Sequence, residues 1–208
     1  MYFMGGYFFE RWSDMPLAQA EKDYIEQKAR ELLLKHGETK IPISPETLAR
    51  REGLDVVYSY IPGNRIGELD GQAKRIIVDE RLKNDPPYAR CVIAHELGHY
   101  VLGNVVPCAN NPGFPQNPKA ALEQMELEAT LFAHALLMPK PYVQKAAEIY
   151  NNNKSSAFDS LLDFICDLFK VTKRKAMNRL EECSIDPYSF KVTGRNAINR
   201  LEECKIVS

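Results

Sequence analysis

The chain has 208 residues, of which 45% are hydrophobic and 26% are charged, and its formal net charge is −1. This composition supports an ordinary globular core, and the near-neutral charge excludes a protein held on nucleic acid or an anionic membrane by bulk charge alone. No apolar run approaches the ~18 residues of a membrane-spanning helix, so no membrane association is expected.

The cysteines and the N-terminal sequence together predict a cytoplasmic location. The chain has five cysteines, an odd number without any C-x-x-C pair, which favours reduced thiols over a disulfide framework. Residues 1–14 form an aromatic-rich segment that lacks the basic region and small-residue cleavage site of a signal peptide.

The first part of the chain predicts two helices followed by strands. Residues 17–36 carry apolar side chains at helical spacing, and Gly37 follows where the helix should end. In SPETLARREG, Ser44 is placed as an N-cap, Pro45 occupies the first helical position and Gly53 ends the helix. β-branched and aromatic residues then predict strands near 55–60 and 74–78, with a third between them left open.

The middle of the chain predicts a buried helix, a loop and two more helices. The stretch DPPYARCVIAHELGHYVLG (residues 85–103) is apolar nearly all round, which is typical of a central, buried helix. Residues 104–119 hold four prolines and predict a loop at the rim of a site. A helix over 120–138 should end at Pro139, and another is expected near 141–150.

The C-terminal region predicts an amphipathic helix followed by an internal repeat. Residues 169–185 (FKVTKRKAMNRLEECSI) recur as residues 190–206 (FKVTGRNAINRLEECKI), offset by 21 residues. Two copies are too few for a solenoid, so we interpret them as a tandem duplication of one terminal segment. The expected organisation is an N-terminal segment (1–14), a core domain (15–150) and a helical C-terminal region (156–208).

Two histidines lie one helical turn apart in the buried helix. His95 and His99 are four residues apart, and Glu96 directly follows the first. Positions i and i+4 share a helix face, so both imidazoles can bind one metal ion. Glu96 lies about 100° round the helix, within reach of a water on that ion. This H-E-x-x-H arrangement is typical of zinc peptidases; the alternative is coincidence, and two buried imidazoles would then need other partners.

A catalytic zinc ion needs a third protein ligand. The helix after the proline-rich loop offers Glu123, Glu126 and Glu128. On a helical wheel Glu126 falls inside the apolar stripe, and the other two fall outside it. A buried carboxylate is costly unless it binds metal or pairs with a cation. Glu126 is therefore the expected third ligand, with a salt bridge to an Arg or Lys as the alternative.

Four neighbouring residues carry secondary expectations. Thr130, one turn farther along that helix, is placed to hydrogen-bond a ligand histidine. His134 is expected to be an exposed helical histidine, with a hydrogen-bond donor at the transition state as the alternative. Cys91 is expected to be a buried, inert thiol, with a competing metal ligand as the alternative. Gly98 costs about 1 kcal/mol relative to alanine in a helix interior, which predicts a close approach by substrate or by a packed helix.

The block AHELGH, followed after a spacer by E-x-x-A-x-x-F-A-x-x-LLMP (residues 126–139), resembles the ImmA/IrrE family of zinc metallopeptidases. The segments ISPETLARREGLDVV, RIIVDERL and FKVT…A.NRL are also similar, so the resemblance covers about residues 17–180. It implies an α+β fold: a small gluzincin-like core of helices and a short, mainly antiparallel sheet, with a helical C-terminal segment. It also implies one Zn²⁺ on His95, His99 and Glu126, with Glu96 as general base. Thr130, where the family often has asparagine, and the duplication depart from the pattern.

Family members act on helix-turn-helix repressors, so the resemblance implies an endopeptidase that cleaves such a repressor and relieves repression. The strand near 75–78 is expected to pair with an extended substrate. The alternatives are a non-cleaving anti-repressor and a DNA-binding regulator with a structural zinc site. Residues 170–208 carry nine Lys/Arg and five Asp/Glu, and LLDFICDLFKVTKRKAMNRL resembles a helix-turn-helix. A helical pair packed on the core is nevertheless favoured over DNA binding.

Overall fold

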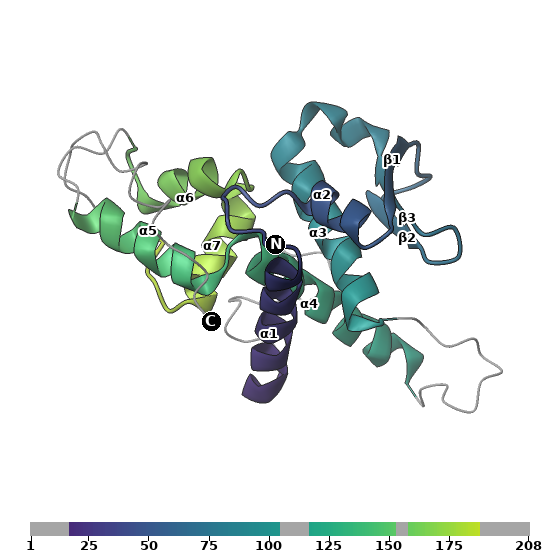
Figure 1. Cartoon of the computed structure of the whole chain (residues 1–208), viewed down its shortest axis with the longest axis horizontal. Helices are drawn as coiled ribbons and strands as arrows, with labels where there is room; N and C mark the ends of the chain where they lie inside the picture. Colours follow the sequence, from purple (N-terminus) through teal and green to yellow (C-terminus); the bar gives the residue numbers. More distant parts are fainter. Residues whose placement is uncertain (1–16, 105–116, 153–157, 188–208) are drawn as a thin grey trace.

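The computed structural model of the chain describes residues 17–104, 117–152 and 158–187. The N-terminal aromatic segment, most of the proline-rich loop and the second repeat copy lie outside these residues. In Figure 1 the sheet, α2 and α3 lie on one side, α5–α7 on the other, and α1 and α4 between them. The elements are α1 (Gln19–Lys35), α2 (Pro45–Arg51), β1 (Asp55–Ser59), β2 (Gly67–Asp70), β3 (Arg75–Asp79), the 3-10 helix η2 (Glu80–Asn84), α3 (Pro86–Leu102), α4 (Pro118–Leu137), α5 (Lys140–Asn152), α6 (Leu161–Phe169) and α7 (Lys173–Glu182).

The helices and the small sheet form an α+β fold, which confirms the predicted class. The sheet itself is mixed rather than mainly antiparallel. Its strand order is β1-β3-β2, in which β2 and β3 pair antiparallel while β1 and β3 pair parallel. The parallel pair arises because the segment after β1 carries the chain past β3 to the far edge, from which β2 turns back into β3.

The strand order places β2, and not β3, at the edge of the sheet that a substrate peptide could pair with. The expectation that residues 75–78 pair with an extended peptide is wrong, because β3 is the central strand and both of its edges are already paired. Within the described residues β2 pairs only with β3, so its outer edge offers unpaired backbone groups. β2 also packs against α3, the helix that carries both histidines.

The ends of α3 and α4 follow rules that the sequence displays. The Asp85 side chain accepts a hydrogen bond from the Tyr88 N–H at the start of α3, and Gly103 ends the helix with φ +68°, a conformation that glycine adopts without strain. Pro118 was expected in the loop but is the first residue of α4, where Asn117 caps the helix. The first helical position suits proline because its missing N–H has no partner there.

The core is built around α3, as its all-round apolar sequence predicts. At the crossing of α3 and α4, Gly98 leaves no side chain between the helices: a Cβ there would lie 3.0 Å from Phe132 Cδ1 and 3.1 Å from the Ala129 carbonyl oxygen. The close approach predicted for Gly98 is therefore made by a packed helix, and this contact sets the spacing of α3 and α4.

The C-terminal helices contribute to the same hydrophobic core, through buried Phe164 and Phe169 of α6 and Leu180 of α7. The division into residues 15–150 and 156–208 stays a prediction. Across the described residues, no helix combines the length and apolarity needed to cross a membrane.

Candidate metal centre

The structure brings together the three side chains predicted to bind metal. His95 and His99 project from α3, and Glu126 faces them from α4. His95 Nε2 lies 3.1 Å from His99 Nε2 and 3.2 Å from Glu126 Oε2, and His99 Nε2 lies 3.4 Å from Glu126 Oε1. The three residues thus form a cluster, called here the metal cluster, that presents one ligand atom each to a common point.

The dimensions and donor atoms of the metal cluster fit a zinc ion. With zinc–ligand distances of ~2.0–2.1 Å and tetrahedral angles, two ligand atoms lie about 3.3 Å apart, and the separations of 3.1–3.4 Å are of this size. Two imidazoles and one carboxylate are also a ligand set of catalytic zinc sites, which keep a fourth position for water. The assignment of zinc to these residues stays a prediction.

The protonation states of His95 and Glu126 suit metal binding, whereas His99 has to release a proton when the metal binds. Burial lowers the pKa of His95, which keeps its ring neutral, and a histidine must be neutral to bind metal. Burial also opposes the charged form of His99, but its hydrogen bond with Glu126 and the negative charge of Glu126 outweigh this and raise its pKa. Hydrogen bonds from both histidines lower the pKa of Glu126, so its side chain is a carboxylate.

Thr130 lies where the sequence places it, behind the first histidine. Its side chain is fully buried, and its Oγ1 is 3.3 Å from His95 Nδ1. A contact at Nδ1 orients the ring so that Nε2 faces the cluster. Asn104, just after α3, donates from Nδ2 to the Met125 carbonyl at 3.2 Å, which ties this end of α3 to α4 beside Glu126.

Glu96 lies beside the metal cluster and is only 8% exposed. Burial raises its pKa to about 7, and the negative charges of Glu126 and Glu68 act in the same direction. The carboxyl therefore changes protonation near neutral pH, as a group that both accepts and releases a proton should.

Gly67 of β2 is a further residue of this site, which the sequence analysis missed. A Cβ at Gly67 would lie 2.7 Å from Glu96 Oε1 and 2.5 Å from Val92 Cγ1, so a larger residue here would displace both side chains from their present positions. Gly67 lies between the two predicted strands, where a third strand was left open, and the glycine could have indicated the site because a glycine in a strand often marks a close approach of the backbone.

The structure corrects the expected burial of Glu126. Its side chain is 49% exposed, and Leu122 of the same helical stripe is 42% exposed. The first turns of α4 extend beyond the core, so continuous burial begins only near Leu127. The helical position of Glu126 therefore predicts the direction of its side chain, toward α3, but not its exposure.

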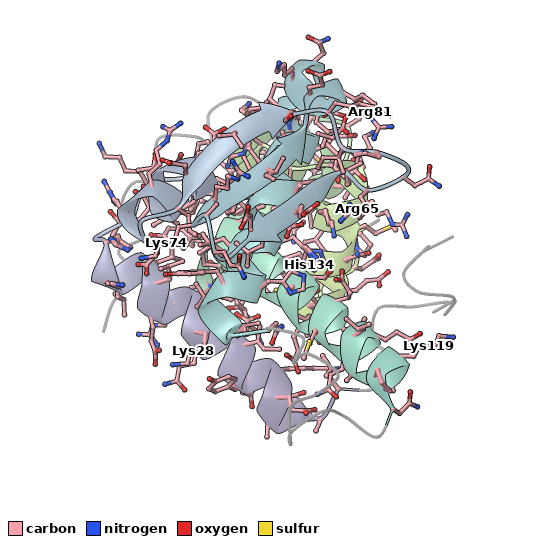
Figure 2. The ribbon with its side chains drawn as sticks, turned by 90° about the vertical axis from the view of Figure 1, so that its right-hand side faces the viewer. Lys28, Arg65, Lys74, Arg81, Lys119 and His134 are labelled. Atoms are coloured by element: carbon pink, nitrogen blue, oxygen red, sulfur yellow. The ribbon has the colours of Figure 1, made fainter. Side chains whose placement is uncertain are left out.

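The expectation that His134 is exposed is wrong. This residue of α4, labelled in Figure 2, is only 1% exposed. It is buried because α7 packs against α4. Its Nδ1 lies 2.6 Å from Glu182 Oε1. Arg179 of α7, also 1% exposed, donates to Glu182 at 2.9 Å, to the Met138 carbonyl at 2.8 Å and to Glu26 of α1 at 3.0 Å. We call Glu26, His134, Arg179 and Glu182 the α7 ion cluster.

Cys91 agrees with its expected role as an inert thiol. It is buried one turn before His95, and burial raises its pKa. A thiol that stays protonated is a poor metal ligand and a poor nucleophile.

An α+β domain with an H-E-x-x-H helix and a converging His–His–Glu cluster defines a metallopeptidase-like class of protein. The model of one family of this class, Peptidase_M78, described as an IrrE N-terminal-like domain, matches residues 49–181. The chain belongs to this family, which confirms the resemblance seen in the sequence.

Two further comparisons concern individual proteins. Among curated proteins none matches the chain. Among solved structures, the chain is similar to a Mycobacterium tuberculosis transcriptional regulator with 17% sequence identity and a TM-score of 0.54. The similarity covers 76% of this chain but only 46% of that one, so the chain spans less than half of its length. At this identity the likeness shows the fold alone.

Proposed function

We propose that the protein is a zinc-dependent endopeptidase that cleaves a helix-turn-helix transcriptional repressor and so relieves repression. The observation that carries this proposal is the convergence of His95, His99 and Glu126 beside the buried Glu96. Membership of a peptidase family supports the chemistry. The family resemblance supports the repressor as substrate, and a similar fold in a transcriptional regulator agrees with a regulatory role.

In the proposed mechanism His95, His99 and Glu126 hold the zinc ion, and Thr130 fixes the His95 ring through Nδ1. When bound, zinc lowers the pKa of a water molecule and polarises the scissile carbonyl. Glu96 accepts the proton of the attacking water on its carboxylate and then passes it to the leaving amine. Its pKa of about 7 suits both transfers.

The outer edge of β2 is the proposed binding site of the substrate backbone. An extended peptide can pair with an unpaired strand edge through main-chain hydrogen bonds. Because Gly67 lets β2 touch Glu96, a peptide on this edge lies next to the general base. Arg65 and Glu68 form an exposed ion pair of 2.9 Å here (Figure 2 labels Arg65), so their side chains are placed to contact the substrate.

A co-expression experiment tests this function. A helix-turn-helix repressor encoded beside this gene is expressed with the wild-type chain or with Glu96→Gln, and the repressor is followed by immunoblot. We expect cleavage with the wild type and intact repressor with the variant, at equal bound zinc. Equal cleavage by both would show that Glu96 is not the base. Intact repressor with both would favour the alternative of a non-cleaving anti-repressor.

The alternative of a DNA-binding regulator finds little support in α6 and α7. The Arg179 guanidinium of α7 is buried in the α7 ion cluster, and Lys173 pairs with Asp163 of α6 at 2.6 Å. Two of the cations of the predicted recognition helix are thus engaged within the protein. A gel-shift assay at low salt tests this alternative, since DNA binding through phosphates is strongest there.

A further inference from the structure

The duplicated segment has a described first copy whose contacts can be compared with the sequence of the second. Copy one is residues 169–185 and copy two is residues 190–206. Copy one forms the end of α6, the turn after it and α7, and it packs against α1, α4 and the rest of α6. We call the surface that receives copy one the α7 seat.

The apolar residues that copy one buries in the α7 seat all recur in the sequence of copy two. The buried apolar side chains of copy one are Phe169, Val171, Ala176, Leu180 and Cys183. Copy two has the same residue at each of these places, as Phe190, Val192, Ala197, Leu201 and Cys204. Copy two therefore carries every apolar side chain that the seat receives.

The buried polar residues of copy one recur in the sequence of copy two, whereas Lys173, which pairs with Asp163 of α6, is replaced by Gly194. Arg179 reaches the Met138 carbonyl and Glu26, and Glu182 reaches His134. Copy two has Arg200 and Glu203 in their places. The partners Glu26, Met138 and His134 belong to α1 and α4, so they are equally available to either copy.

The two copies differ at four positions, and none of these is buried in copy one. Lys173, Lys175, Met177 and Ser184 are replaced by Gly194, Asn196, Ile198 and Lys205. Identity between the copies thus includes every residue buried in the seat, and variation is confined to the rest. This is the pattern expected if both segments fit one surface.

We propose that the α7 seat is an interaction surface with two alternative occupants in the same chain, and that copy two docks there when copy one is displaced. The occupant is residues 190–206 of the same molecule. In the exchange α6 keeps its place up to residue 168, and residues 169–189, one repeat in length, loop out. Loop closure costs little more as a loop lengthens, and a short tether gives copy two a high local concentration.

Copy one is the preferred occupant for two physical reasons. Its docking needs no looped-out repeat, and Gly194 and Asn196 are poorer helix residues than the lysines of copy one. Copy two therefore acts as a reserve, and its docking would replace the positive charge of Lys175 by the neutral Asn196 on the helix that packs against α4.

The test compares four full-length chains: wild type, Leu180→Asp, Leu201→Asp and the double variant. Leu180 is fully buried, so an aspartate there removes copy one from the seat. We expect Leu201→Asp to melt with the wild type and the double variant to melt at least about 10 °C lower. The melting temperature of Leu180→Asp should fall by less than half as much as that of the double variant, because copy two replaces copy one.

Hydrogen exchange gives a second, direct measurement. In the wild type, peptides from 169–185 should be protected more than those from 190–206, and in Leu180→Asp this order should reverse. Ser184, which is exposed, and its counterpart Lys205 serve as controls: Ser184→Asp and Lys205→Asp should change neither result. If the aspartates prevent folding, Leu180→Ala and Leu201→Ala are compared in the same way.

Two outcomes would overturn the proposal. One is a Leu180→Asp chain that melts as low as the double variant, which would show that copy two does not fit the seat. The other is a Leu180→Asp chain whose melting temperature rises with protein concentration and which forms a dimer in size-exclusion chromatography. This would mean that copy two docks on a second molecule.

Discussion

Two polar clusters on α4 differ in how their charges are balanced. Glu126 and His134 are eight residues apart, which is about 12 Å along a helix. In the α7 ion cluster, Arg179 lies between two carboxylates and His134 meets one of them. In the metal cluster, the ion pairs of Glu126 within the described residues are those with His95 and His99. The first cluster pairs its charges with one another, while the second brings three metal-ligating atoms close together, and we expect it to bind an ion.

The largest effect should come from the base beside the metal cluster. Glu96→Gln keeps the size of the side chain but cannot accept a proton, so the hydrolysis rate should fall by roughly 10²–10⁴-fold. The measurement is cleavage of the repressor, or of a peptide from it, at saturating zinc. Bound zinc, measured by atomic emission, should match the wild type, which distinguishes loss of the base from loss of the site.

The next effect concerns the third ligand. Glu126→Ala removes the only carboxylate of the metal cluster, so the purified protein should lose most of its bound zinc, because a catalytic site needs three protein ligands. Glu123→Ala and Glu128→Ala, on the same helix, are the matched controls and should keep the metal. Full metal retention by Glu126→Ala would remove this residue from the ligand set.

The comparison predicts opposite results for two histidines. His134→Ala leaves Glu182 without one partner and opens a cavity, so the free energy of unfolding should fall by about 2–4 kcal/mol with zinc binding unchanged. His95→Ala should abolish zinc binding and destabilise the metal-free protein less than His134→Ala does, because the side chain of His95 is 19% exposed and that of His134 only 1%. Urea unfolding after chelation measures both. Equal losses of stability would erase the distinction between the two clusters.

The smallest effect is expected at Thr130. Thr130→Val keeps the shape of the side chain and removes the Oγ1 contact with His95 Nδ1, so zinc affinity should fall by roughly 10–100-fold. Thr130→Ser, which retains the hydroxyl, should bind zinc like the wild type. An unchanged affinity in the valine variant would assign Thr130 to packing alone.

The features that the sequence predicted well depend on residues close together in the chain. The boundaries of α3 follow from Asp85, the following prolines and Gly103, and the approach of His95 to His99 follows from one helical turn. Glu126 was selected because a helical wheel gives the direction of a side chain, although the same wheel misjudged its exposure.

The features that it predicted poorly depend on distant partners. His134 is buried by Glu182, 48 residues away, and no local pattern shows that α7 covers this turn. The position of β3 between two strands depends on where the segment after β1 crosses the sheet. Gly67 acquires its role only when β2 meets Glu96 of α3.

The glycine at the crossing of α3 and α4 has a consequence for how this protein can change during evolution. The gap between the histidines and Glu126 is set partly by the contact of the Gly98 backbone with Ala129 and Phe132. Gly98 contributes no side chain to this contact. Substitutions far from this crossing therefore act on that gap less directly than a substitution at position 98. Position 98 is where a single added methyl group would push the two halves of the metal cluster apart.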